Sequence, residues 1–170
     1  MKTVIVMAAH GAPPNDFPRE ELREFFTLHS RLEASAVSHS PALESRYEEL
    51  ENKLKTWPRT PQNDPYHAAS YELACKLSEE TGTEVVVGFN EFCAPGIENV
   101  LDGAVGRGAG RVVVITTMLT RGGEHAERDI NQAVSRARQK HPGVEIIYAW
   151  PYEPGEIARF LAGHLKKYLK

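Results

Sequence analysis

Two histidines and one glutamate stand shortly after apolar segments of the sequence, where they could bind a metal ion. They are His10, Glu91 and His125, and each follows a strand-length run rich in Val, Ile, Met or Ala. Two imidazoles and one carboxylate suit a borderline divalent ion such as Co²⁺, Fe²⁺, Ni²⁺ or Zn²⁺. Taken singly, each has an ordinary alternative: a histidine capping a strand, a solvated loop glutamate, or an exposed histidine in the first turn of a helix.

The apolar segments that must position these residues are typical of buried parallel strands. Four such runs occur, at 3–9, 84–89, 111–118 and 144–150. From the second run onward, strands alternate with helical spacing, which indicates a parallel sheet with helices on both faces. We therefore predict an open, flavodoxin-like α/β fold of about four strands in the order 2-1-3-4. In this order the carboxyl ends of the first three strands are neighbours, so His10, Glu91 and His125 would share one cleft.

The region between the first two strands contains more predicted helices than a connection between parallel strands needs. Helical spacing occurs at 18–34, 41–57, 66–81, 95–106, 124–139 and 154–169. One crossover helix would connect two parallel strands, yet three are expected between the first two. Residues of about 35–65 therefore indicate a helical insertion, which either serves a site or interface or is additional helical cover. We predict one domain spanning residues 1–170.

Two neighbours strengthen the expected role of His125 and His10. The amino end of a helix disfavours a charged imidazolium, so His125 should be neutral and able to bind a metal or accept a proton. Asp129 lies four residues further on and could orient His125, although an ion pair with an arginine is the alternative. Gly11 indicates a close backbone approach beside His10. His67, at the start of a predicted helix, is a weaker candidate.

Composition and motifs exclude several other classes of function. The formal net charge of −3 over 170 residues argues against nucleic acid as the main partner. Cys75 and Cys93 form no C-x-x-C pair and predict reduced thiols in a cytoplasmic protein. No apolar run of the sequence approaches membrane-spanning length, so no membrane partner is expected. The turn HGAPPNDF lacks the dinucleotide and nucleoside-triphosphate motifs, so no organic cofactor is expected.

Three segments together resemble the class II tetrapyrrole metal chelatases, especially the short sirohydrochlorin cobaltochelatase and ferrochelatase group. They are VIVMAAHG, GFNEFCAPGIENVL and VVVITTMLTRGGEHAERDI, and the likeness covers most of residues 1–15 and 83–150. It implies that His10, Glu91 and His125 are the metal-binding and catalytic residues. It also implies that Co²⁺, Fe²⁺ or Ni²⁺ is a substrate, inserted into a tetrapyrrole for cobalamin, siroheme or heme-type biosynthesis.

The likeness leaves the macrocycle open and implies partners. The region from Arg46 to Ala74 resembles the N-terminal half of protoporphyrin-type ferrochelatases, so a porphyrin is an alternative substrate. Full-length family members contain two α/β halves, which implies that this chain acts as a homodimer. Arg121 and Arg128 could pair with the carboxylates of the substrate, or they are ordinary solvated arginines. A non-catalytic metal or tetrapyrrole carrier remains a rival hypothesis, as does a small metallohydrolase, which the lack of a second acidic cluster disfavours.

Overall fold

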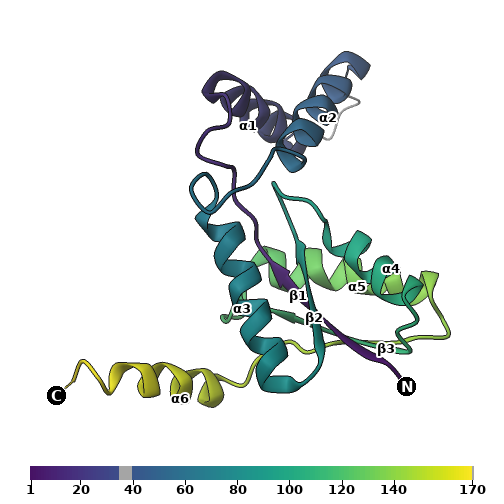
Figure 1. The fold of residues 1–170 in the computed structure, drawn as a ribbon. Helices are drawn as coiled ribbons and strands as arrows, with labels where there is room; N and C mark the ends of the chain where they lie inside the picture. Colours follow the sequence, from purple (N-terminus) through teal and green to yellow (C-terminus); the bar gives the residue numbers. More distant parts are fainter. Residues whose placement is uncertain (35–39, 170) are drawn as a thin grey trace.

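The computed structural model describes residues 1–34 and 40–169, and its centre is one parallel sheet (Figure 1). The strands are β1 (Thr3–Ala9), β2 (Glu84–Phe89), β3 (Arg111–Thr116) and β4 (Glu145–Tyr148). Their order is β2-β1-β3-β4, with every pair parallel. The predicted sheet and strand order are confirmed, although β3 and β4 each end two residues earlier than predicted.

The register brings three strand ends to one edge of the sheet. Ala9 of β1 pairs with Phe89 of β2, and Ala8 pairs with Thr116 of β3. The loops after β1, β2 and β3 therefore begin side by side, although they lie far apart in the sequence.

Helices lie on both faces of the sheet, as predicted. On one face, α4 (Ile97–Gly106) and α5 (Ile130–Lys140), here called the α4–α5 layer, pack on β1 and β3 around Val6, Leu101 and Val134. On the other face, α3 (Pro65–Thr81) packs beside β2 and β1. The last helix, α6 (Pro154–Leu165), leads away from the sheet (Figure 1). No helix among the described residues has the length and apolar character needed to cross a bilayer.

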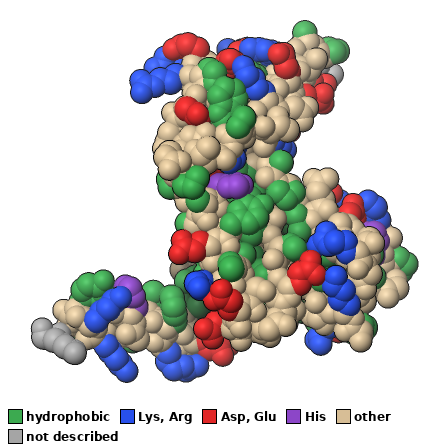
Figure 2. Space-filling view, viewed as in Figure 1, with side chains coloured by type: hydrophobic (Ala, Val, Ile, Leu, Met, Phe, Trp, Pro, Cys, Tyr) green, Lys and Arg blue, Asp and Glu red, His purple; other side chains and the backbone are tan. Residues whose placement is uncertain are grey.

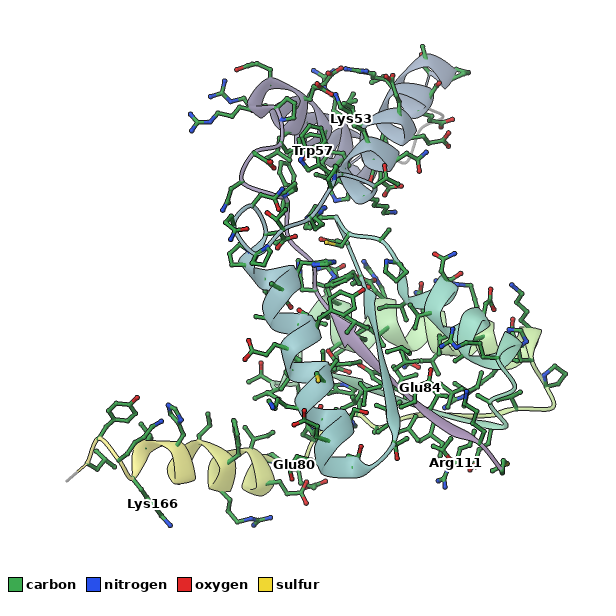
Figure 3. The ribbon with its side chains drawn as sticks, in the orientation of Figure 1. Lys53, Trp57, Glu80, Glu84, Arg111 and Lys166 are labelled. Atoms are coloured by element: carbon green, nitrogen blue, oxygen red, sulfur yellow. The ribbon has the colours of Figure 1, made fainter. Side chains whose placement is uncertain are left out.

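The first two helices form a separate pair, here called the helical arm. It consists of α1 (Arg19–Ala34) and α2 (Pro41–Lys55), which share their own core around Phe25, Leu50 and Leu54. Figure 3 shows Lys53 in α2 and Trp57 just after the end of that helix. The insertion expected at about 35–65 contains α2, whereas residues 35–39 lie outside the described residues. The crossover between β1 and β2 is made by α3.

Two predicted helices are irregular at their start. The helix predicted from Pro95 begins at Ile97, after a loop that bonds back to β2 through the N–H of Phe89 and the carbonyl of Pro95 (2.9 Å). The helix predicted at 124–139 begins with a π-helical turn, His125–Asp129, before α5. Neither irregularity disturbs the apolar spacing, so the sequence pattern does not reveal them.

Candidate metal site

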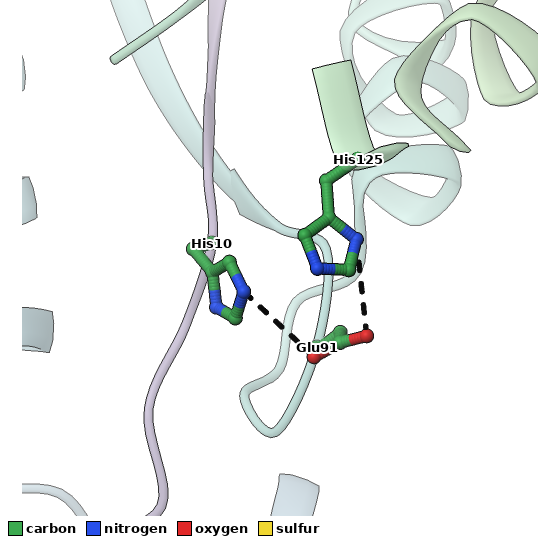
Figure 4. A group of neighbouring side chains, drawn as sticks. All are labelled: His10, Glu91 and His125. Atoms are coloured by element: carbon green, nitrogen blue, oxygen red, sulfur yellow. Dashed lines mark ion pairs between the residues drawn. The ribbon is translucent and has the colours of Figure 1, made fainter. Parts of the chain in front are cut away.

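His10, Glu91 and His125 lie together beyond the carboxyl ends of β1, β2 and β3 (Figure 4). One possible ligand atom from each side chain lies within 4.8 Å of the other two. The rings of His10 and His125 meet edge to face, with centroids 4.6 Å apart. The Glu91 carboxylate lies 4.0 Å from Nε2 of His10 and 3.9 Å from Nδ1 of His125. The structure thus brings together the three residues that the sequence analysis selected.

Backbone contacts hold the loop of Glu91 against the end of β1. The N–H of Asn90 donates to the carbonyl of Ala9, and the N–H of Glu91 donates to the carbonyl of His10, both at 2.9 Å. Gly11 has a φ of +97°, and a Cβ there would lie 1.9 Å from the carbonyl oxygen of Glu91. Any larger residue would push the loop away, so Gly11 is needed for the short distance between Glu91 and His10.

The protein fixes the proton position of His10 through the nitrogen that faces away from Glu91. Nδ1 of His10 lies 2.9 Å from the carbonyl oxygen of Gly11. Because a carbonyl oxygen can only accept, Nδ1 carries the proton and Nε2 presents its lone pair. The backbone N–H of His10 donates to the hydroxyl of Tyr66 at 3.1 Å, which connects the site to α3.

Asp129 fixes the proton position of His125 in the same way. Nδ1 of His125 lies 2.7 Å from Oδ2 of Asp129. A carboxylate only accepts, so Nδ1 donates and Nε2 is left for a metal. The amide nitrogen of Asn90 lies 3.0 Å from the same Nδ1, but it cannot donate to a protonated nitrogen. It donates instead to Oδ2 of Asp129, at 3.4 Å.

Asp129 lies in the same π-helical turn as His125, and hydrogen bonds keep the Asp129 carboxylate ionised. The N–H of Ile130 donates to the carbonyl of His125, the i→i+5 bond of a π-turn. Burial raises the pKa of Asp129, but hydrogen bonds from His125, Arg128 and Asn90 outweigh burial and hold the pKa below its ordinary value. Asp129 is therefore a permanent acceptor for His125 at neutral pH.

A buried ion pair between Arg59 and Asp64, here called the Arg59 clasp, ties the two site loops to the helical arm. The side chains are 7% and 1% exposed. Arg59 also donates to the carbonyls of Ala12, Leu54 and Phe92. These carbonyls belong to the loop after His10, the end of α2 and the loop after Glu91. Sequence reasoning missed the clasp; its one local signal is Asp64 before Pro65, a helix-start pattern in which Asp64 accepts from the N–H of His67.

A cavity of about 450 Å³ opens between the arm and the α4–α5 layer, where Figure 2 shows the surface hollowed. Glu91 and Asp129 line it together with two cations, Lys55 from α2 and Arg136 from α5. Each cation is paired with a carboxylate that also lines the cavity, Lys55 with Glu51 at 3.0 Å and Arg136 with Glu98 at 2.5 Å. Its volume falls in the range of roughly 300–1,000 Å³ typical of small-molecule sites. The two cations escaped sequence reasoning because they occupy helix positions that are usually solvated.

Of the three cluster residues, Glu91 lines this cavity, whereas His10 and His125 do not. The remaining predicted residues are not among its lining residues either. Arg121 is more than half exposed and lies 4.0 Å from Glu153. Arg128 pairs with Glu124 at 2.5 Å, and its Nε donates to Asp129 at 3.0 Å. His67 stacks on Phe89, with ring centroids 5.3 Å apart, and burial lowers its pKa. It does not belong to the three-residue cluster.

The geometry agrees with a comparison against known families. A family model described as CbiX matches residues 62–158, which is more than half of the chain. The chain belongs to the CbiX family. The matched segment contains Glu91 and His125, whereas His10 and the helical arm precede it.

Individual relatives are distant. A sirohydrochlorin ferrochelatase from Priestia megaterium is 26% identical over 85 residues, which are 50% of this chain and 31% of that protein. The chain therefore matches less than one third of this curated relative's length. The structure of a putative cobalamin (vitamin B12) biosynthesis CbiX protein from Marinobacter aquaeolei VT8 is 16% identical. It has a TM-score of 0.57 over 98% of this chain and 97% of that chain, which shows a common fold.

A further solved structure is the sirohydrochlorin chelatase SirB from Bacillus subtilis subspecies spizizenii in complex with cobalt. It is 20% identical to this chain, with a TM-score of 0.44 over 89% of this chain and 44% of that chain.

Proposed function

We propose that this CbiX-family chain is a metal chelatase that inserts Co²⁺ or Fe²⁺ into a tetrapyrrole such as sirohydrochlorin. The observation that carries the proposal is the cluster of His10, Glu91 and His125 beside a cavity of small-molecule size. Three protein ligands leave further coordination positions open, as in metal sites that exchange ligands. An ion that is a substrate must be both bound and released, and an open site suits both steps.

In the proposed reaction the metal replaces two pyrrole protons, so the site must bind the ion and accept protons. We assign His10 and His125 as metal ligands through Nε2 and as proton acceptors, and Glu91 as a carboxylate ligand or proton relay. The macrocycle would occupy the cavity, where its carboxylates would have to replace Glu51 and Glu98 as partners of Lys55 and Arg136. Arg121 and Arg128 remain candidates for carboxylates that extend beyond the cavity.

We further propose that residues 1–170 act as one chelatase-like unit that pairs with a second copy. The resemblance to family members with two α/β halves supports this homodimer. Both cysteines, Cys75 and Cys93, are free thiols. This state agrees with a reducing compartment, and we propose the cytoplasm.

An absorbance assay with purified protein, Co²⁺ and metal-free sirohydrochlorin tests the proposal. We expect insertion at least about 100-fold faster than without protein, because positioned proton acceptors typically contribute this much. His10→Ala should abolish the acceleration. His141→Ala is the matched control, because His141 also pairs with a carboxylate (Asp102, 2.7 Å) but lies after the far end of α5.

Other outcomes would point to the rival functions. Spectral binding of sirohydrochlorin without faster insertion would indicate a carrier. Insertion into protoporphyrin but not into sirohydrochlorin would indicate a porphyrin ferrochelatase. Hydrolysis of esters or phosphates with Zn²⁺, without tetrapyrrole binding, would refute the chelatase.

A further inference from the structure

The two faces of the sheet are covered to different extents. On the face under the α4–α5 layer, one row across three strands is 0–5% exposed, and it consists of Val4, Val112 and Ile146. The adjacent row on the opposite face is partly exposed in all three strands, and it consists of Ile5, Val113 and Ile147. Apolar strands of a parallel sheet are normally covered on both faces, so this second row lacks a helix.

The helix on the opposite face, α3, leaves this row uncovered. Tyr71 of α3 is on the β2 side, where its ring lies 6.1 Å from that of Phe89. Leu73 follows Tyr71 by two residues, about half a turn of the helix, and Leu77 is one turn further on, so both lie on the other side of α3. Leu73 is 49% exposed and Leu77 is partly exposed. We call the exposed row Ile5, Val113 and Ile147, together with Leu73 and Leu77, the open strip.

The helix α6 has an apolar face without a partner in the described chain. Ile157, Phe160, Leu161 and Leu165 recur at helical spacing. Phe160, Leu161 and Leu165 are 66%, 49% and 47% exposed, and no residue of α6 is buried. Figure 2 shows hydrophobic side chains gathered on α6, and Figure 3 shows Lys166 directed into solvent just beyond it. An apolar surface of this kind marks a packing site.

The segment between β4 and α6 directs α6 away from the open strip of its own chain. The N–H of Ala149 donates to the carbonyl of Val114 at 2.8 Å, which extends the sheet by one residue. The hydroxyl of Tyr152 then donates to the carbonyl of Thr116 at 2.5 Å. Both contacts hold the segment at the carboxyl edge of the sheet, and α6 continues outward from there (Figure 1).

We propose that α6 of each chain packs on the open strip of a second copy, so that two chains exchange their last helices. The exchange is reciprocal and therefore gives a closed two-fold dimer with two equivalent contacts. It covers the apolar face of α6 and completes the second face of the sheet in both copies. The inference rests on the homodimer of the proposed function, but it does not depend on metal insertion.

Light scattering on the full chain and on two α6 variants tests the exchange. The wild type should have twice the 18.9 kDa mass of one chain. Leu161→Glu should weaken dimerisation at least about 100-fold, because each dimer would bury two unpaired carboxylates. Arg159→Glu, an exposed position on the same helix, should remain dimeric. Both substitutions leave the buried core intact, and circular dichroism checks the fold.

A mixing experiment separates exchange from other arrangements. Val113→Lys alters the strip, so it should also be monomeric. Mixed with Leu161→Glu, it should regain dimers, because the intact α6 of the strip variant meets the intact strip of the helix variant. Dimers that persist in Leu161→Glu, or a mixture that stays monomeric, would overturn the exchange and leave the chelatase standing.

Two further outcomes complete the test. A monomeric wild type whose melting temperature falls in Leu161→Glu would show that α6 packs on its own chain, and would overturn the exchange. Dimers that behave as predicted but insert no metal would refute the proposed function and leave the exchange intact.

Discussion

Two charged clusters at the carboxyl edge of the sheet are built in opposite ways. In the Arg59 clasp, four guanidinium N–H groups have partners, and the Nε–H lacks one among the described residues. In the cluster of His10, Glu91 and His125, the side chains are 28–37% exposed, and each imidazole keeps one lone pair for a ligand. The Arg59 clasp therefore holds loops in place, whereas the cluster of His10, Glu91 and His125 retains groups that can bind a metal ion.

The two clusters are also connected. Arg59 binds the carbonyl of Ala12, two residues after His10, and the carbonyl of Phe92, next to Glu91. Phe92 has a φ of 58°, a conformation that costs a side-chain-bearing residue about 1–3 kcal/mol and persists when its surroundings hold it. The clasp therefore stabilises the loop that presents Glu91, and the two clusters should respond differently to substitution.

The largest expected effect on stability comes from breaking the clasp. Arg59→Met should lower the free energy of unfolding by about 3–5 kcal/mol, because Asp64 would remain buried without its partner. Urea denaturation measures the change. In the control, Arg23→Met removes an exposed pair with Glu20 and should change stability by less than about 1 kcal/mol. A similar, small loss in both variants would show that the clasp is not structural.

Substitutions in the cluster of His10, Glu91 and His125 should reduce metal affinity but leave the stability of the fold nearly unchanged. His125→Ala should weaken Co²⁺ binding at least about 100-fold, because it removes one of three ligands. It should change stability by less than about 1 kcal/mol, since the side chain is partly exposed. Calorimetric titration with Co²⁺ measures the affinity, with His164→Ala on α6 as the control. Equal affinities for His125→Ala and the wild type would exclude His125 as a ligand.

Substitution of Asp129, which bonds to the proposed metal ligand His125, should have a smaller effect on Co²⁺ affinity. Asp129→Asn should weaken Co²⁺ binding by about 10–100-fold, because a neutral amide accepts the Nδ1 proton of His125 more weakly than a carboxylate does. The lowered pKa of Asp129 also means that its ionised form stabilises the fold above the unfolded value of 3.8, and that this contribution is lost as pH falls through the lowered pKa. Unfolding measured across acidic pH should therefore be less pH-dependent in the variant. An unchanged affinity and pH profile would contradict this role.

The smallest effect concerns the two thiols. Cys93 is buried, its Sγ lies 3.6 Å from Asp64, and burial raises its pKa to about 11, whereas Cys75 is exposed. A thiol reagent at pH 8 should therefore label Cys75 rapidly and Cys93 slowly, and Cys75→Ser should remove the fast phase. Arg59→Met should accelerate labelling of Cys93. Two equally fast phases in the wild type would show that the clasp is open in solution.

The sheet and the convergence of the site residues were predictable for the same reason. Strands such as TVIVMAA are apolar at nearly every position, which is typical of a parallel sheet, and the strand order then determines which loops meet. The likeness of GFNEFCAPGIENVL to the chelatases agrees with the family that the comparisons show. The roles of His10, Glu91 and His125 remain predictions.

Other features depend on contacts that a linear pattern does not encode. In the sequence, Arg59 is a single charged residue in a proline-rich segment. Its carbonyl partners lie 5, 33 and 47 residues away, so no local pattern indicates them. The π-turn at His125 leaves the apolar spacing unchanged. The helix α6 was predicted from its periodicity, but periodicity shows that an apolar face exists and not where that face packs.

The most direct test of the central claim is the initial rate of Co²⁺ insertion into sirohydrochlorin by Glu91→Gln compared with the wild type. Glutamine keeps the size of the side chain and removes the negative charge between the two imidazoles. We predict a rate at least about 100-fold lower, with an unchanged melting temperature. A rate within about twofold of the wild type would contradict a chelatase whose metal is held by His10, Glu91 and His125.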